Sequence, residues 1–175
     1  MNWRAQSIAS ALQMRSEQPR MIPLQMMVLS LTGDCNLACR YCYAFGQDQS
    51  MMTWETARCA IDLAAAGGAP FILQFSGGEP LLALSLLRRI ADYVRTNQIR
   101  ARMDLQTNGT LLTEETADFL HHAGIGIGIS LDGRPDVHDV YRCYSDGRGS
   151  SMDVIAGIQC LGRRGIAIGL TCVVT

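Results

Sequence analysis

The sequence lacks long hydrophobic runs, blocks of basic residues and a secretion signal, and each absence excludes a class of protein. No apolar run approaches the roughly 18 residues that cross a membrane, and the N-terminus shows no apolar segment ending in a small-residue cleavage site. The formal net charge is −1 over 175 residues, without the basic patch typical of nucleic-acid-binding proteins. We therefore expect neither a membrane protein nor a nucleic-acid-binding protein, and we predict a cytoplasmic location.

The composition of the chain fits a globular domain. Hydrophobic residues make up 48% and charged residues 18% of it, which is enough for one core and too apolar for a disordered segment. Residues 1–23 form an N-terminal extension, in which three arginines accompany one glutamate. This excess of positive charge is compatible with a transit peptide or with a helix lying on the domain. Residues 24–175 are interpreted as the core domain.

Apolar runs alternate with helical patterns along this core domain. Five runs predict strands at 27–32, 71–75, 102–106, 126–131 and 166–174. Between them, capping or first-turn residues precede apolar positions at helical spacing and predict helices that start near Thr53, Pro80, Thr113 and Ser151. Strands separated by helices pair in parallel through right-handed crossovers. The sequence thus predicts an α/β fold, a partial (β/α) barrel of about five parallel strands with outer helices.

Polar or glycine-rich motifs follow four of the predicted strands. They are the cysteine-containing stretch 35–42, SGGEP at 76–80, TNG at 107–109 and SLDG at 130–133. The carboxyl ends of parallel strands lie at one end of a barrel, where active sites are built. We therefore expect the four motifs to meet in one site. The last residues, 170–175, are still strand-like, and we expect them to belong to a longer barrel.

Three of the seven cysteines are grouped, with the spacing Cys35-x3-Cys39-x2-Cys42. A structural zinc site usually closes with four ligands, and an iron–sulfur cube normally also takes four thiolates. Three thiolates leave one iron open to a small molecule, which favours a reactive cluster. A CxxC redox pair formed by the last two cysteines is the alternative, and it leaves the first unexplained. The four cysteines outside this group are predicted to be buried as small apolar side chains: Cys59, Cys143, Cys160 and Cys172.

The cysteine motif, with Tyr41 in its last gap, resembles the signature of the radical S-adenosylmethionine (SAM) superfamily. The GGEP stretch at 77–80 looks like the second-strand motif of that superfamily. Three further segments look like anaerobic sulfatase-maturating enzymes and related SPASM-type peptide maturases: LQTNGTLL, GISLDGRPDVHDVYR and GIAIGLTCVVT. The resemblance covers residues 24–175. It identifies the chain as an N-terminal part of a radical SAM core domain, truncated before the last strand.

The resemblance implies an oxidoreductase-like iron–sulfur enzyme with two cofactors, a [4Fe–4S] cluster and SAM. In such enzymes an electron from the cluster cleaves SAM to methionine and a 5′-deoxyadenosyl radical, which takes a hydrogen atom from the substrate. The implied metal ligands are Cys35, Cys39 and Cys42. The implied SAM-binding residues are Tyr41, Gly78, Ser130 and Arg142. The implied partners are a peptide or protein substrate and an electron donor such as flavodoxin or ferredoxin.

Several alternatives stay open at this point. Ser76 stands where the most similar sulfatase maturases carry a larger amide residue, so sulfatase maturation and ribosomal-peptide modification are both compatible with the sequence. A structural metal- or cluster-binding module, and a fragment without turnover, are the alternatives to an enzyme. No catalytic residue is assigned, and no role is given to the three histidines at 121, 122 and 138.

Overall fold

The computed structural model describes residues 24–44, 46 and 48–174 of the chain, and the predicted N-terminal extension at 1–23 lies outside them. Five strands form one sheet in the order β1-β2-β3-β4-β5, and every neighbouring pair is parallel. The strands are β1 (Met26–Ser30), β2 (Phe71–Ser76), β3 (Ala101–Thr107), β4 (Gly126–Ser130) and β5 (Ile168–Thr171). This sheet confirms the predicted partial barrel of parallel strands.

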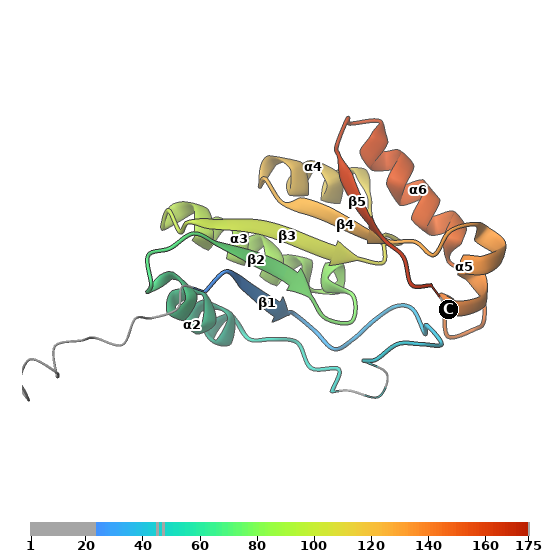
Figure 1. Ribbon diagram of the computed structural model, residues 1–175, viewed down its shortest axis with the longest axis horizontal. Helices are drawn as coiled ribbons and strands as arrows, with labels where there is room; N and C mark the ends of the chain where they lie inside the picture. The colour runs from blue at the N-terminus through green and yellow to red at the C-terminus, as the bar shows by residue number, and fades with distance from the viewer. Residues whose placement is uncertain (1–23, 45, 47, 175) are drawn as a thin grey trace, which may run out of the picture.

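Helices connect successive strands and cover one face of the sheet (Figure 1). They are α2 (Trp54–Ala65), the 3-10 helix η1 (Pro80–Ala83), α3 (Leu84–Thr96), α4 (Glu114–His122), α5 (Pro135–Tyr141) and α6 (Ser151–Gly162). In the part of the chain that the structure describes, no helix is both long and apolar enough to span a bilayer.

The predicted helix starts agree with the structure at Thr53, Thr113 and Ser151, the first residue of α6, and differ at Pro80. The side chains of Thr53 and Thr113 each accept a hydrogen bond from the backbone N–H three residues later, as N-caps do. Pro80 opens the 3-10 turn η1, and α3 begins only at Leu84. Helix α5 was not predicted, because its seven residues are too few to show a helical period.

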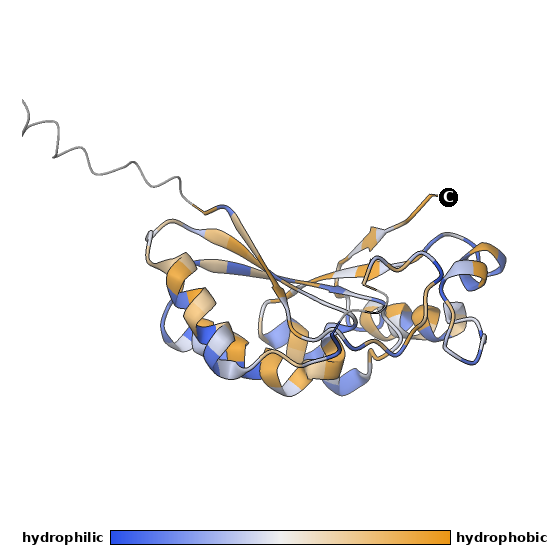
Figure 2. Cartoon of the chain, turned by 90° about the horizontal axis from the view of Figure 1, so that it is seen from below, coloured by the Kyte–Doolittle hydropathy of each residue, from blue (hydrophilic) through white to orange (hydrophobic). Residues whose placement is uncertain are grey.

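The core lies between the sheet and the helices. Along β2 burial alternates, so that Phe71, Leu73 and Phe75 point into the core while Ile72 and Gln74 lie on the other face. Burying a Phe or Leu side chain contributes about 1.5–3 kcal/mol. Figure 2 shows the strands on one side of the molecule and the helices on the other. This one-sided packing fixes the register of the strands and so brings their carboxyl ends to one edge.

The four scattered cysteines do not share one environment. Cys160 is buried, as predicted, and Cys143 is half-buried, whereas Cys59 and Cys172 are exposed. The prediction of burial is therefore wrong for the last two. Cys59 lies on α2 away from its buried residues, and Cys172 follows the end of β5.

Candidate functional site

The residues predicted to form a site meet at the carboxyl edge of the sheet. Two adjoining cavities lie there, each of about 340 Å³. Both are lined by Cys35, Cys39 and Cys42. The second is also lined by Tyr41, Gly78, Ser130 and Arg142. The fold thus brings together seven residues from four separate parts of the sequence, around a space of the size that small-molecule ligands occupy.

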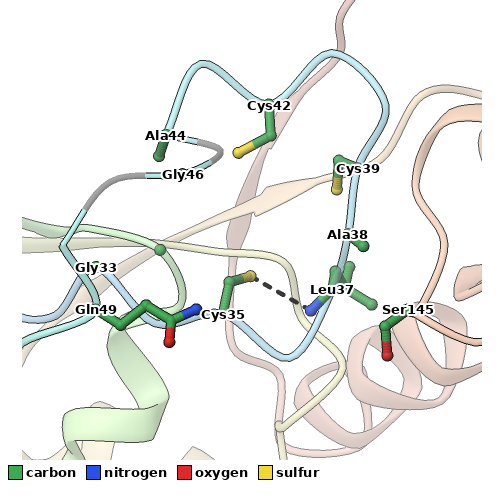
Figure 3. Close-up of a pocket in the computed structure, with 11 residues that line it drawn as sticks. Gly33, Cys35, Leu37, Ala38, Cys39, Cys42, Ala44, Gly46, Gln49 and Ser145 are labelled. Atoms are coloured by element: carbon green, nitrogen blue, oxygen red, sulfur yellow. Dashed lines mark hydrogen bonds between the residues drawn. The ribbon is translucent and has the colours of Figure 1, made fainter.

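The three cysteines come from one irregular loop after β1, and their sulfur atoms surround a common space (Figure 3). Backbone hydrogen bonds hold this loop against the segment that ends α5. The N–H of Ala38 donates to the carbonyl of Cys143 at 2.7 Å, and the N–H of Arg40 donates to the carbonyl of Tyr141 at 2.8 Å. Contacts with a distant part of the chain therefore position the thiols.

Burial controls the electrostatics of these thiols. It raises the pKa of Cys35, and it raises the pKa of Cys39 to about 11 although the Arg142 guanidinium opposes the rise. Because burial disfavours the charged thiolate, the thiolate form needs a positive charge beside it to be stable, and bound iron supplies that charge. Within the described ranges, no three His, Cys, Asp or Glu side chains converge closely enough to hold a single metal ion. Three soft thiolates spread around a cavity do fit a cubane cluster, because each binds a different iron.

The glycine turn after β2 packs directly against the cysteine loop. Gly77 has a φ of +137°, a conformation that residues with a side chain rarely adopt. The N–H of Gly78 donates to the carbonyl of Thr32 at 2.8 Å, and a Cβ at Gly78 would collide with the backbone carbonyl of Asp34. The family resemblance implied that Gly78 contacts SAM. In the structure the close approach of Gly78 is to another loop, although Gly78 also lines both cavities.

Glu79, the next residue, is fully buried and joins the second motif to the third. Its carboxylate accepts hydrogen bonds from the backbone N–H of Leu81 (3.0 Å) and of Asn108 (2.8 Å). The Thr107 hydroxyl also donates to it, at 2.7 Å. Burial raises the pKa of Glu79, and these three bonds oppose that rise. The sequence analysis gave Glu79 no role of its own, so this connecting role was missed.

A second buried carboxylate, Asp132, joins the fourth motif to the first. Its side chain is 2% exposed and accepts a hydrogen bond from Nε of Arg142 at 2.9 Å. It also accepts hydrogen bonds from the Tyr41 hydroxyl and from the N–H of Val173. Burial raises the pKa of Asp132, but these hydrogen bonds outweigh burial and hold it below the ordinary value. The sequence analysis gave Asp132 no role of its own; its place two positions after Ser130 at a strand end was the available signal.

Ser130 and Arg142 both line the second cavity. The Ser130 hydroxyl accepts a hydrogen bond from Nε2 of Gln106 at 3.1 Å. The side chain of Arg142 is 11% exposed, and its guanidinium carbon lies 5.3 Å from the centre of the Tyr41 ring. The fold thus places the hydroxyl of Ser130 and the positive charge of Arg142 at the same cavity.

His138, to which the sequence analysis gave no role, is a fully buried member of the frame around Arg142. Its Nδ1 accepts a hydrogen bond from the N–H of Asp132 at 3.2 Å, and its Nε2 lies 3.0 Å from the Ser150 hydroxyl. That hydroxyl donates to the Arg142 carbonyl at 2.8 Å. Burial lowers the pKa of His138, which agrees with a neutral ring that accepts at Nδ1. Its role is to hold the end of α5 in place.

Comparisons with known proteins agree with this geometry. Fe-coproporphyrin III synthase of Methanosarcina barkeri is 35% identical, over 83% of this chain and 36% of its own. The serine-type anaerobic sulfatase-maturating enzyme of Bacteroides thetaiotaomicron is 31% identical, over 82% of this chain and 38% of its own. The solved structure of anSMEcpe with bound AdoMet and the Cp18Cys peptide has a TM-score of 0.79 and 26% identity, over 87% of this chain and 44% of that one.

The chain therefore spans less than half the length of these three relatives. Residues 29–175 match the family model described as the Radical SAM superfamily. This match covers the strand-end motifs and confirms the resemblance seen in the sequence. The chain belongs to the radical SAM superfamily, whose cofactors are S-adenosylmethionine and a [4Fe–4S] cluster.

Proposed function

We propose that the protein is a radical SAM enzyme that abstracts a hydrogen atom from a side chain of a peptide or protein substrate. The observation that carries the cofactor chemistry is the arrangement of three thiols and four further strand-end residues around two adjoining cavities. With both cofactors bound, the cluster supplies one electron that splits SAM into methionine and a 5′-deoxyadenosyl radical, the species that takes the hydrogen atom. The protein binds, orients and shields these groups.

The cysteines are proposed as the ligands of three irons. Because the motif supplies three thiolates, the fourth iron stays open for the amino and carboxylate groups of SAM. The burial of Cys39 supports this role, since a buried thiol gains most from a bound metal. An external electron donor, such as flavodoxin or ferredoxin, belongs to the same proposal.

The other four residues are proposed to bind SAM. Arg142 supplies a positive charge that can bind a carboxylate, and its hydrogen bond to Asp132 uses one of the five donors of the guanidinium. Ser130 supplies a hydroxyl beside it, the Tyr41 ring is proposed to lie beside the adenine, and Gly78 to meet the methionine amino group. All four line the same cavity.

The relatives support two substrate classes. Those named sulfatase-maturating enzymes, and the solved structure with a bound peptide, favour a peptide or protein side chain. A relative at 35% identity is named Fe-coproporphyrin III synthase, a name that gives the product, so a tetrapyrrole precursor of an iron porphyrin is the second candidate substrate. The residues that line the two cavities favour neither substrate class, because the seven with a proposed role are assigned to the cluster and to SAM.

Anaerobic reconstitution tests the cofactor assignment. We expect about four irons per chain, and loss of the cluster when Cys35, Cys39 or Cys42 is replaced by alanine. Cys59→Ala and Cys160→Ala are the matched controls and should keep full iron. A triple cysteine variant that retained its full iron content would contradict the proposal.

SAM binding to the reconstituted protein tests the remaining residues. Ser130→Ala and Arg142→Ala should each weaken SAM binding, by about 0.5–3 kcal/mol for a lost hydrogen bond, with the larger loss for the charged Arg142. Unchanged affinity in both variants would refute their assignment. The substrate class is then decided by measuring dithionite-driven formation of 5′-deoxyadenosine in the presence of a cysteine- or serine-containing sulfatase peptide and in the presence of a tetrapyrrole precursor of an iron porphyrin.

A further inference from the structure

Cys35 differs from the other two grouped cysteines in the hydrogen bonds that its sulfur accepts. The backbone N–H of Leu37 donates to it at 3.4 Å, the bond drawn in Figure 3. Nδ2 of Asn108, from the loop after β3, approaches it at 3.8 Å. Among the described residues, no donor is found within bonding distance of the Cys39 or Cys42 sulfur. Of the three sulfurs, that of Cys35 is thus the one that accepts hydrogen bonds from the described part of the protein.

The Asn108 side chain is held toward Cys35 by a closed ring of hydrogen bonds. Its Oδ1 accepts from both the backbone N–H (3.0 Å) and the hydroxyl (2.8 Å) of Thr110. That hydroxyl accepts from Nδ2 of Asn36 at 2.8 Å, and Oδ1 of Asn36 accepts from Nδ2 of Asn108 at 2.9 Å. Because a backbone N–H can only donate, the oxygen of the Asn108 amide must face Thr110. Its NH₂ group must then face Cys35.

The backbone of Asn108 is fixed as firmly as its side chain. Its N–H donates to the buried carboxylate of Glu79 at 2.8 Å, and the residue is 8% exposed. The amide is therefore a preorganised N–H dipole aimed at one sulfur. In the same loop, the N–H of Gly109 donates to the Thr107 hydroxyl at 3.0 Å.

We propose that Asn108 is a positioning residue that raises the reduction potential of the cluster through its hydrogen bond to Cys35. This inference rests on the proposed role of Cys35 as a ligand. A cluster that accepts one electron gains one negative charge, part of which resides on its cysteine sulfurs. An N–H donor at such a sulfur stabilises the reduced state more than the oxidised state. The residue thereby makes electron entry from the external donor easier.

The test is the midpoint potential of the reconstituted full chain, followed by electron paramagnetic resonance during a redox titration. Asn108→Ala should assemble the full cluster but shift the potential to a more negative value. If the equilibrium constant for reduction falls about tenfold, the shift is about 59 mV for one electron. Asn108→Asp, which keeps the shape and replaces the NH₂ group by an oxygen, should shift the potential further in the same direction.

Two other variants complete the series. Thr110→Val removes the hydroxyl from the ring and leaves the backbone N–H bond to Asn108, so its shift should be smaller than that of Asn108→Ala. Asn97→Ala, at an exposed asparagine that ends α3 and donates to a backbone carbonyl, is the matched control and should leave the potential unchanged.

The outcomes separate this inference from the proposed function. A wild-type chain that takes up no iron would overturn both. A fully loaded Asn108→Ala variant with the wild-type potential would overturn the inference and leave the proposed function standing. If Asn108→Ala failed to fold, Thr110→Val would decide, and an unchanged potential in that variant would refute the role of the ring.

Discussion

Replacing Asp132 by alanine should destabilise the chain strongly, because it leaves a largely buried arginine, with 11% of its side chain exposed, without its carboxylate. Asp132 accepts a charged hydrogen bond from Arg142 and two more from Tyr41 and Val173. Hydrogen bonds to charged groups contribute about 1.5–3 kcal/mol each. Removing one partner of a buried ion pair costs about 3–5 kcal/mol in total. These contributions overlap, since the three bonds share one carboxylate, so we expect the free energy of unfolding to fall by about 3–5 kcal/mol.

Urea denaturation of the cluster-free chain under reducing conditions measures this loss. Without the cofactors, two-state analysis and linear extrapolation are appropriate. With a denaturant slope of about 2 kcal/mol per molar urea, the midpoint should move down by about 1.5–2.5 M. The slope itself should not change, because the variant buries nearly the same surface in its folded state.

The matched control is Asp136→Ala, four positions further along the chain. Asp136 also pairs with an arginine, Arg134, but both side chains are well exposed, at 63% and 80%, and exposed pairs contribute little. Its midpoint should stay at the wild-type value. A double variant, Asp132→Ala with Arg142→Met, should recover part of the loss, because it removes the unpaired buried charge. If Asp132→Ala and Asp136→Ala had the same midpoint, the reasoning from burial would be refuted.

Two further predictions concern the turn after β2. Gly78→Ala places a methyl group against the Asp34 carbonyl and should lower the free energy of unfolding by about 1–3 kcal/mol in the same urea assay, with lower iron uptake on reconstitution. The control is Gly67→Ala, where a Cβ meets open space. Equal stability of the two variants would contradict the packing argument. Glu79→Gln replaces a carboxylate that accepts three hydrogen bonds by an amide that also donates, so it should cost about 1–3 kcal/mol. The exposed Glu55→Gln should not measurably change the midpoint, and a Glu79→Gln midpoint equal to it would show that Glu79 does not join the two motifs.

Much of the fold was predictable because its signals are local. An apolar run, a threonine cap and apolar positions at helical spacing each depend on a few neighbouring residues. The five strands were therefore placed correctly to within a few residues at their ends. The short helix α5 escaped prediction because seven residues do not display a period.

The cysteine motif was predictable for the same reason. Cys35, Cys39 and Cys42 lie within eight positions of the sequence, so their number and spacing could be interpreted without knowing how the chain folds. The strand-end rule of parallel sheets then grouped them with the motifs at 76–80, 107–109 and 130–133. Their convergence around two cavities agrees with that rule.

The sequence by itself thus determined the fold class, the cysteine group and the edge of the sheet where the motifs meet. The tertiary structure alone decided which residues support that group: the buried carboxylates of Glu79 and Asp132, the neutral ring of His138 and the amide of Asn108. The physical reason is that the energy of a polar or charged side chain depends on its burial and on its partners. Those partners are often distant in the chain, as Tyr41 is from Asp132, and they become neighbours only when the strands pair.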